Sequence, residues 1–413
     1  MNYRKLGNSG AVVSVYCLGT MTFGHESDET TSFGLMDDYV GAGGNFIDTA
    51  DVYSAGASEE IIGRWLKSKP GIAKELVIAT KGRFPIGAGP NNLGLSRKHL
   101  GAALDASLRR LGVEQIDLYQ MHAWDALTPL EETLRFLDDS IHKGKIAYYG
   151  FSNFLGWQLT KAVWLAKANG CAPPVTLQPQ YNLLVRDIEH EIVPASLDAD
   201  IGLLPWSPLG GGWLSGKYKR DQIPTGATRL GENPKRGMEA FDARNARSIT
   251  WNVIGAVEDI AKALGVSMAQ VALAWIAAQP AVTSVILGAR TREQLADNLG
   301  AAKLVLADES NPRAVAFQLL AISRHLAALP RERHGTSTTP EAQATAAVMA
   351  ALRRADMVKI ARGGPAERDG RPKLDRLCTG LTSDLAEISD LLSEAYFKHA
   401  VAEPLAAAQP ARA

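Results

Sequence analysis

The sequence predicts an α/β fold, a (β/α)8 TIM barrel that is followed by a C-terminal α-helical appendage. Short apolar runs rich in β-branched residues alternate with longer amphipathic stretches in eight successive units between residues 14 and 302. This alternation is typical of parallel strands joined by crossover helices. An open doubly wound sheet alternates in the same way, but it would usually carry a GxGxxG loop after an early strand, and the sequence contains none. The barrel is therefore the favoured interpretation.

The expected elements follow one another in the order of a barrel. The eight strands are expected at Val15–Thr20, Asn45–Ala50, Leu76–Lys81, Asp117–His122, Ile146–Ser152, Val175–Gln180, Gly202–Pro208 and Val282–Gly288. Helical stretches follow most of them and include Glu59–Lys67, Arg97–Leu111, Pro129–Lys143 and Gln158–Ala168. Glycine or proline punctuates most helix ends. For the third of these helices, Thr128 is the expected N-cap and Pro129 the first helical residue.

Changes in composition divide the chain into three parts. Residues 1–307 are expected to form the barrel. Within them, Leu214–Ser248 is rich in Gly, Pro, Lys and Arg and lacks periodicity, so it should form a large loop on the catalytic face after the seventh strand. Residues 308–402 show only amphipathic helix patterns, at Ala314–Leu329, Pro340–Arg362 and Leu374–Phe397. Residues 403–413 are expected to be a disordered tail.

Charge and composition narrow the classes of function. The 413 residues include 44 Lys and Arg and 44 Asp and Glu, so no overall field favours a nucleic acid or an anionic membrane as partner. The hydrophobic fraction is 46% and no long uninterrupted apolar run occurs, which is typical of a soluble protein. The start of the chain lacks signal-peptide features, and Cys17, Cys171 and Cys378 are spaced for neither a metal site nor a disulfide framework. We expect a cytoplasmic protein without a metal ion.

Four ionisable side chains stand at or just after the ends of consecutive expected strands. Asp48 and Tyr53 belong to the end of the second strand, Lys81 ends the third and His122 ends the fourth. Each has an ordinary structural explanation by itself, such as packing, solvation, helix capping or a hydrogen bond in the core. Because the C-terminal ends of barrel strands face the active site, their occurrence together indicates one catalytic group.

This combination suits the protonation of a carbonyl oxygen during reduction by hydride. An unperturbed tyrosine, with a pKa of about 10, is a poor proton donor at neutral pH. A neighbouring Lys81 ammonium would stabilise the phenolate and lower the pKa of Tyr53, and Asp48 would hold that ammonium in place. His122 would orient the substrate carbonyl or share the proton. The expected partner is a small-molecule carbonyl substrate.

Several phrases resemble the aldo-keto reductase family over about residues 2–305. They are Asn45–Ala50 with Tyr53, Ala79–Lys81, Gln120–His122, Gly150–Phe154, Leu177–Asn182 and Pro205–Gly210. The family's tetrad of Asp, Tyr, Lys and His maps onto Asp48, Tyr53, Lys81 and His122. The resemblance implies reduction of aldehydes or ketones with a nicotinamide cofactor, with Tyr53 as the general acid.

The resemblance also implies which residues contact the cofactor. Those that face the nicotinamide are Ser152, Asn153, Gln178 and Trp206, and those of the two phosphate-binding segments are Ser207, Leu209, Gly210, Lys217, Gly288, Arg290, Gln294 and Asn298. The loops after strands seven and eight are the usual phosphate region of this barrel. NADPH is expected rather than NADH, because the planar guanidinium of Arg290 suits a 2′-phosphate. Without this context, Lys217 and Arg290 would be interpreted as solvated loop charges.

Beyond Ala307 the sequence departs from that family and resembles the end of the bacterial alpha-E domain. The matching segments run from Asn311–Leu319 through His325–Pro330 to Ala395–His399, and about the last third of such a domain is present. The alternative is a helical extension that packs on the barrel or mediates association, because apolar helix faces must be covered. Whether the chain forms a homo-oligomer therefore stays open.

Three functions are compatible with these observations. The first is an NADPH-dependent reductase. The second is a nucleotide-binding regulatory protein of the same fold, like the potassium-channel β-subunits, with little turnover. The third is a scaffold whose helical tail is the working part. The sequence does not determine the physiological substrate, because loops such as Leu214–Ser248 line the pocket.

Overall fold

The computed structural model describes residues 1–226, 228–235 and 237–304. The expected helical appendage at 308–402 and the expected tail at 403–413 lie outside the described residues. The chain divides into two compact units, of which the first comprises Met1–Arg244 and Ser267–Leu304 and the second includes Asn245–Val266. The expected site residues all belong to the first unit.

The first unit contains the expected (β/α)8 barrel. Eight parallel strands pair in the order β10-β3-β4-β5-β6-β7-β8-β9. They are β3 (Tyr16–Gly19), β4 (Phe46–Asp48), β5 (Val77–Gly82), β6 (Ile116–Met121), β7 (Ile146–Ser152), β8 (Thr176–Gln178), β9 (Gly202–Leu203) and β10 (Val285–Gly288). Backbone bonds from Leu203 to Ala281, 2.8 Å, and from Ile286 to Pro205, 3.0 Å, connect β9 with the β10 segment and close the sheet. Most of the strands are shorter than expected, because residues expected at their ends belong to the adjoining loops.

A short antiparallel hairpin precedes the barrel and was not expected from the sequence. Its strands are β1 (Tyr3–Lys5) and β2 (Val12–Ser14). Between them, Leu6 is fully buried in a core cluster with strand residues such as Phe46 and Leu118. Gly7 has a φ of +55°, and a side chain there would meet the backbone of Val175 and Gly202. The hairpin therefore packs against the N-terminal ends of β8 and β9, opposite the expected catalytic face.

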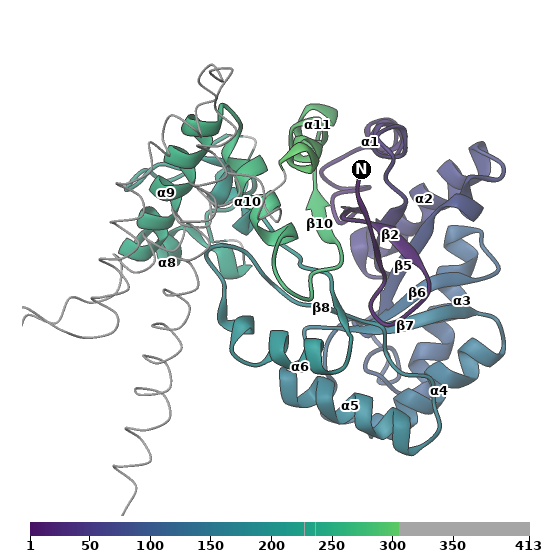
Figure 1. Ribbon diagram of the computed structural model, residues 1–413. Helices are drawn as coiled ribbons and strands as arrows, with labels where there is room; N and C mark the ends of the chain where they lie inside the picture. The colour runs from purple at the N-terminus through teal and green to yellow at the C-terminus, as the bar shows by residue number, and fades with distance from the viewer. Residues whose placement is uncertain (227, 236, 305–413) are drawn as a thin grey trace, which may run out of the picture. The chain divides into compact units, whose positions relative to one another are not determined.

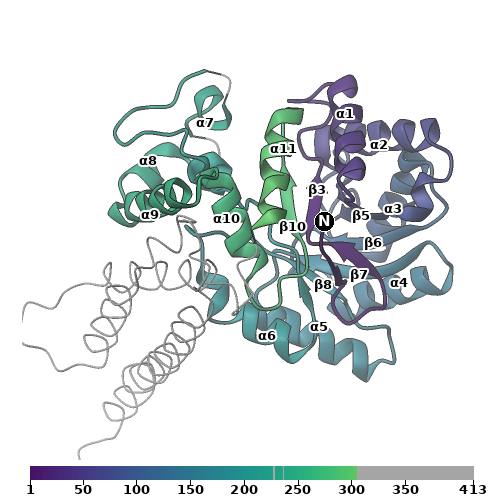
Figure 2. The same ribbon diagram turned by 45° about the horizontal axis from the view of Figure 1, so that its top comes forward.

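Helices cover the outside of the sheet, as Figures 1 and 2 show for α1 to α6. They are α1 (Glu29–Gly41), α2 (Ala57–Ser68), α3 (Arg97–Leu111), α4 (Leu130–His142), α5 (Gly156–Ala168), α6 (Ile192–Asp198), α10 (Met268–Ala277) and α11 (Arg292–Gly300). The expected start of α4 is wrong: Pro129 is the N-cap, and the Thr128 hydroxyl donates a 2.6 Å hydrogen bond to Asp125. The Asp125 carboxylate is within reach of this hydroxyl because Asp125 lies three residues before Thr128 in the same turn.

The expected loop after the seventh strand is long but contains short helices. They are α7 (Arg229–Glu232), a 3-10 turn at Gly237–Glu239 and α8 (Phe241–Asn245), and α9 (Ser248–Leu264) follows in the second unit. Helices of four or five residues leave too weak a periodicity to be recognised in the sequence. Among the described helices, no single one is long and apolar enough to cross a membrane, although α9 and α10 pass that test as a bent pair.

Candidate active site

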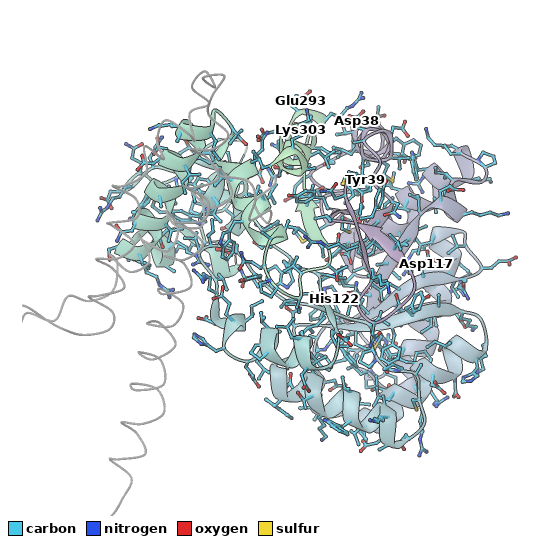
Figure 3. The ribbon with its side chains drawn as sticks, in the orientation of Figure 1. Asp38, Tyr39, Asp117, His122, Glu293 and Lys303 are labelled. Atoms are coloured by element: carbon cyan, nitrogen blue, oxygen red, sulfur yellow. The ribbon has the colours of Figure 1, made fainter. Side chains whose placement is uncertain are left out.

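The four expected catalytic residues come together at the C-terminal end of the barrel. Asp48 ends β4, Lys81 lies one residue before the end of β5, and His122 directly follows β6. Tyr53 begins the 3-10 turn that follows β4. Parallel pairing of β4 with β5 and of β5 with β6 brings these strand ends side by side. Figure 3 shows His122 beside the strands, whereas Asp38 and Glu293 lie on outer helices.

The ammonium group of Lys81 is fully buried and makes three short contacts. It donates to Asp48 Oδ2 at 2.5 Å, to the Thr49 carbonyl at 2.8 Å and to the Tyr53 hydroxyl oxygen at 3.2 Å. Burial alone would lower the pKa of Lys81, but the charges and hydrogen bonds of Asp48 and Tyr53 outweigh it and raise this pKa to about 12. Lys81 is therefore a permanent cation, and its bond to the phenol oxygen leaves the phenolic proton free to point elsewhere.

The pKa of Tyr53 is shifted in the opposite direction from the expectation. Burial raises it, and the lowering effect of Lys81 is smaller. Asp48 and Asp51 also raise the pKa of Tyr53 through their negative charges. The expected net lowering is therefore wrong for the protein without bound ligands, because desolvation of the phenolate costs more than one cation recovers. The consequence is a phenol that stays protonated at neutral pH.

Two glutamine side chains hold the other oxygen of Asp48. Gln120 Nε2 and Gln178 Nε2 each donate to Asp48 Oδ1 at 2.9 Å. Gln178 was expected to contact the cofactor, whereas Gln120 was missed. The available signal was alternation along β6, which puts Gln120 on the same face of the strand as His122. Together with Lys81, these donors satisfy a carboxylate that is only 2% exposed.

His122 stands beside the phenol as a neutral imidazole. Its ring centroid lies 5.9 Å from that of Tyr53 and 4.7 Å from that of Phe84, both in edge contacts. Burial, then the charges of Lys81 and Arg83, lower the pKa of His122 to about 2. Its buried Nδ1 has no hydrogen-bond partner among the described residues. A neutral ring of this kind can hydrogen-bond to a substrate oxygen without adding a charge.

The residues expected near the nicotinamide form a connected set next to these groups. Asn153 Nδ2 donates to Ser152 Oγ and to the His122 carbonyl, both at 3.0 Å. Trp206 Nε1 donates to Asn153 Oδ1 at 3.1 Å, and Ser152 Oγ donates to the Gln178 carbonyl at 2.9 Å. Asn153 has a φ of 55°, an uncommon conformation for a residue with a side chain. The ends of β7 and β8 are thereby tied to the end of β6.

The residues expected near the phosphates occupy two segments. After β9, the Gly210 N–H donates to the Ser207 carbonyl at 2.9 Å, and Leu209 immediately precedes the turn at Gly210–Ser215. Partial burial, then the charges of Arg290 and Arg229, lower the pKa of Lys217. This mutual influence means that three cations gather here. Arg229 was missed because nothing in the sequence places it near Lys217.

In the segment after β10, two residues that were expected to contact the cofactor form hydrogen bonds with the backbone of the same segment. Asn298 Nδ2 donates to the Gly288 carbonyl at 3.2 Å, and Gln294 Oε1 accepts from the Arg290 N–H at 2.9 Å. The expected solvated alternative for Arg290 is not what the structure shows, because its side chain is 20% exposed and its guanidinium forms ion pairs with Glu26 and Glu232. Across the described part of the chain, no group of three His, Cys, Asp or Glu side chains could hold a metal ion.

A closed eight-stranded barrel whose strand ends hold a buried lysine–aspartate pair, a tyrosine and a histidine defines an oxidoreductase class. The chain belongs to the aldo/keto reductase family, whose model matches residues 16–318. A second model, a predicted alpha-helical domain with a conserved ER motif named Alpha-E, matches residues 241–397. The two matches overlap, since the second begins before the first ends.

Curated relatives are similar along most of their own length. An uncharacterized oxidoreductase YrpG of Bacillus subtilis is 39% identical over 75% of this chain and 93% of its own. A probable voltage-gated potassium channel subunit beta of Oryza sativa is 38% identical over 74% and 92%. The versiconal hemiacetal acetate reductase of Aspergillus parasiticus is 33% identical over 75% and 94%.

Proposed function

We propose that this protein reduces aldehydes or ketones to alcohols with NADPH, and that Tyr53 is the general acid. The observation that carries the proposal is the bonding of the Lys81 ammonium to both Asp48 and the Tyr53 hydroxyl oxygen. A permanent cation at this oxygen stabilises the phenolate that forms when the phenol gives up its proton. Two of the relatives are named as an oxidoreductase and a reductase, which agrees with this chemistry.

The side chains divide the task of proton transfer among them. NADPH, when bound, supplies the hydride. Tyr53 donates its proton to the substrate oxygen as negative charge develops there, a contribution typical of general acids of about 10²- to 10⁴-fold. Lys81 and Asp48 hold the phenol oxygen in position and balance the charge that remains on it. The neutral His122 orients the carbonyl beside the phenol.

NADPH is supported by the cations near the expected phosphate segments. Burial lowers the pKa of Lys217, in the loop after β9, and Lys217 lies close enough to Arg290 after β10 and to Arg229 that both positive charges lower it further. Burial, then the positive charges of Arg290 and Arg229, disfavour the charged form of Lys217, and a dinucleotide with a 2′-phosphate supplies negative charges that would favour it. The residues present therefore fit this cofactor.

The test is NADPH oxidation, followed by absorbance, with 4-nitrobenzaldehyde or methylglyoxal. Tyr53→Phe removes only the hydroxyl, so turnover should fall by at least about 10²-fold, while NADPH affinity stays nearly unchanged. Binding is measured separately by titration calorimetry. A variant that keeps its turnover, or that loses NADPH binding, contradicts the role of Tyr53 as the acid.

A second function is a nucleotide-binding regulatory protein with little turnover. It is favoured by the relative from Oryza sativa, which is named as a probable potassium channel subunit. The same assay separates the two. Tight NADPH binding by the native chain, without reduction of any compound in a broad aldehyde panel, would select the regulatory function and reject the reductase.

A further inference from the structure

The guanidinium of Arg290 is held by two carboxylates that come from distant parts of the chain. Its Nη1 donates to Glu232 Oε1 at 2.7 Å, and its Nη2 donates to Glu232 Oε2 at 3.1 Å and to Glu26 Oε1 at 3.0 Å. Glu26 lies in the loop after β3, and Glu232 is the last residue of α7. Both terminal nitrogens are therefore engaged before any ligand binds.

The two carboxylates differ in how firmly they are placed. The Glu26 side chain is 8% exposed, whereas that of Glu232 is 44% exposed. The backbone of Arg290 is fixed from the side of Glu26, because the neighbouring Ser27 hydroxyl donates to the Arg290 carbonyl at 3.2 Å. Glu232 belongs to a four-residue helix within the long loop after β9. Glu232 is thus the partner that can leave, and Glu26 is the partner that stays.

We propose that Glu232 competes with the 2′-phosphate of NADPH for Arg290 and thereby limits the preference for NADPH over NADH. This inference rests on the proposed function, in which Arg290 receives that phosphate. A carboxylate and a phosphate both bind a guanidinium in the same bidentate way, so only one of them can use the same pair of nitrogens. NADH carries a hydroxyl at this position and does not require Glu232 to leave.

Charge supports the same assignment. The single positive charge of Arg290 faces the two negative charges of Glu26 and Glu232, so this group repels an anion until Glu232 departs. Lys217 lies near Arg290 and adds a further positive charge that attracts the phosphate. Because the Glu232 side of this ion pair is 44% exposed, the pair is weak enough to be exchanged for a doubly charged phosphate. Glu232 then affects the choice between NADPH and NADH without preventing NADPH from binding.

The experiment uses the full chain and measures NADPH and NADH binding by titration calorimetry. Glu232→Gln keeps the size of the side chain and removes its charge. The matched control is Glu29→Gln, because Glu29 forms a bidentate pair with Arg64 at 2.9 and 3.0 Å and is 46% exposed, on a helix outside the site. Both variants remove a bidentate ion pair of a glutamate with similar exposure, 46% for Glu29 and 44% for Glu232.

We expect Glu232→Gln to bind NADPH roughly three- to fivefold more tightly, the size of one exposed ion pair, with NADH affinity unchanged within about twofold. Glu29→Gln should alter neither. In an Arg290→Ala background the Glu232 substitution should have no effect on the ratio of affinities. An unchanged or smaller preference for NADPH in Glu232→Gln overturns the inference and leaves the proposed function intact. A native chain that binds neither nucleotide overturns both.

Discussion

The ion pair between Lys81 and Asp48 is shielded from water, and its value lies in placing groups and not in stabilising the fold. Moving two charges out of water costs several kcal/mol per ion, which their attraction offsets only when further hydrogen bonds complete the shell. Here the Thr49 carbonyl, Gln120 and Gln178 supply those bonds. The three N–H donors of the ammonium bind Asp48, the Thr49 carbonyl and the Tyr53 hydroxyl oxygen. These bonds hold the ammonium against the phenol oxygen.

His122 gives the folded protein a sensitivity to acid. The unfolded chain takes up a proton near pH 6.5, whereas burial, Lys81 and Arg83 keep the native imidazole neutral down to about pH 2. Stability from this group is therefore present above pH 6.5 and is lost as the pH falls. We expect the free energy of unfolding to drop between pH 7.5 and 5 by up to about 2 kcal/mol more in the native chain than in His122→Gln. Urea unfolding at both pH values measures the difference.

Asp51 provides a control of opposite sign for that measurement. Burial, then Glu59, raise the pKa of Asp51 to about 7, and its carboxylate oxygens have no hydrogen-bond partner within the described part of the chain. The native state holds this proton while the unfolded chain releases it, so stability falls as the pH rises from about 4 to 7. Asp51→Asn should remove that loss. If both variants change acid stability in the same direction, the assignment to His122 is wrong.

At the scale of elements, the pairing of β3 with β10 places two glycines opposite each other with unequal room. Gly19 and Gly288 are register partners at the end of this pair. A methyl group at Gly19 would lie 2.6 Å from Ile286 Cγ2 and 3.0 Å from the Leu287 carbonyl, whereas one at Gly288 meets no described atom within 4 Å. The close packing of the two strands therefore requires glycine at position 19 but not at position 288.

We expect Gly19→Ala to lower the free energy of unfolding by about 1–3 kcal/mol, because the packed strand must shift to admit the methyl group. Gly288→Ala should change it by less than about 0.5 kcal/mol. Urea unfolding of the two variants side by side makes the comparison. If both substitutions change the free energy of unfolding equally, the change comes from replacing glycine in a strand and not from the contact with Ile286.

At the scale of the whole molecule, the chain leaves the first unit at Asn245 and returns to it at Ser267. All the expected site residues nevertheless lie in that unit, from Asp48 at the end of β4 to Asn298 on α11. The two family matches overlap at residues 241–318, which include this segment of the second unit and the end of the barrel. The four expected catalytic residues therefore lie before the Alpha-E match, whereas the expected cofactor residues within it are Gly288, Arg290, Gln294 and Asn298.

We expect a chain truncated after Ala307 to keep a turnover comparable to that of the full chain, because every contact described in the site is made by residues before that point. The measurement is NADPH oxidation with 4-nitrobenzaldehyde, with circular dichroism to show that the truncated chain is folded. A folded truncated chain without activity, or one that does not fold, would assign a necessary role to the C-terminal residues.

The sequence by itself determined the barrel and its four central side chains. Alternation of apolar and amphipathic stretches depends only on local spacing, and the C-terminal ends of parallel strands must share one face. Asp48, Lys81 and His122 could therefore be grouped before their contacts were known. The Asp48 partner Gln178 was expected nearby, although its bond to the carboxylate was not.

Only the tertiary structure decided the electrostatics of the site. The pKa of Tyr53 depends on how far water is excluded, and burial outweighs the Lys81 charge that the sequence indicates. The ion pair of Arg290 with Glu26 joins residues 264 positions apart, and no local pattern marks such a pair. Charge interactions and desolvation act through space and depend on the folded positions of every neighbour, so they follow from the packing of the chain and not from its spacing.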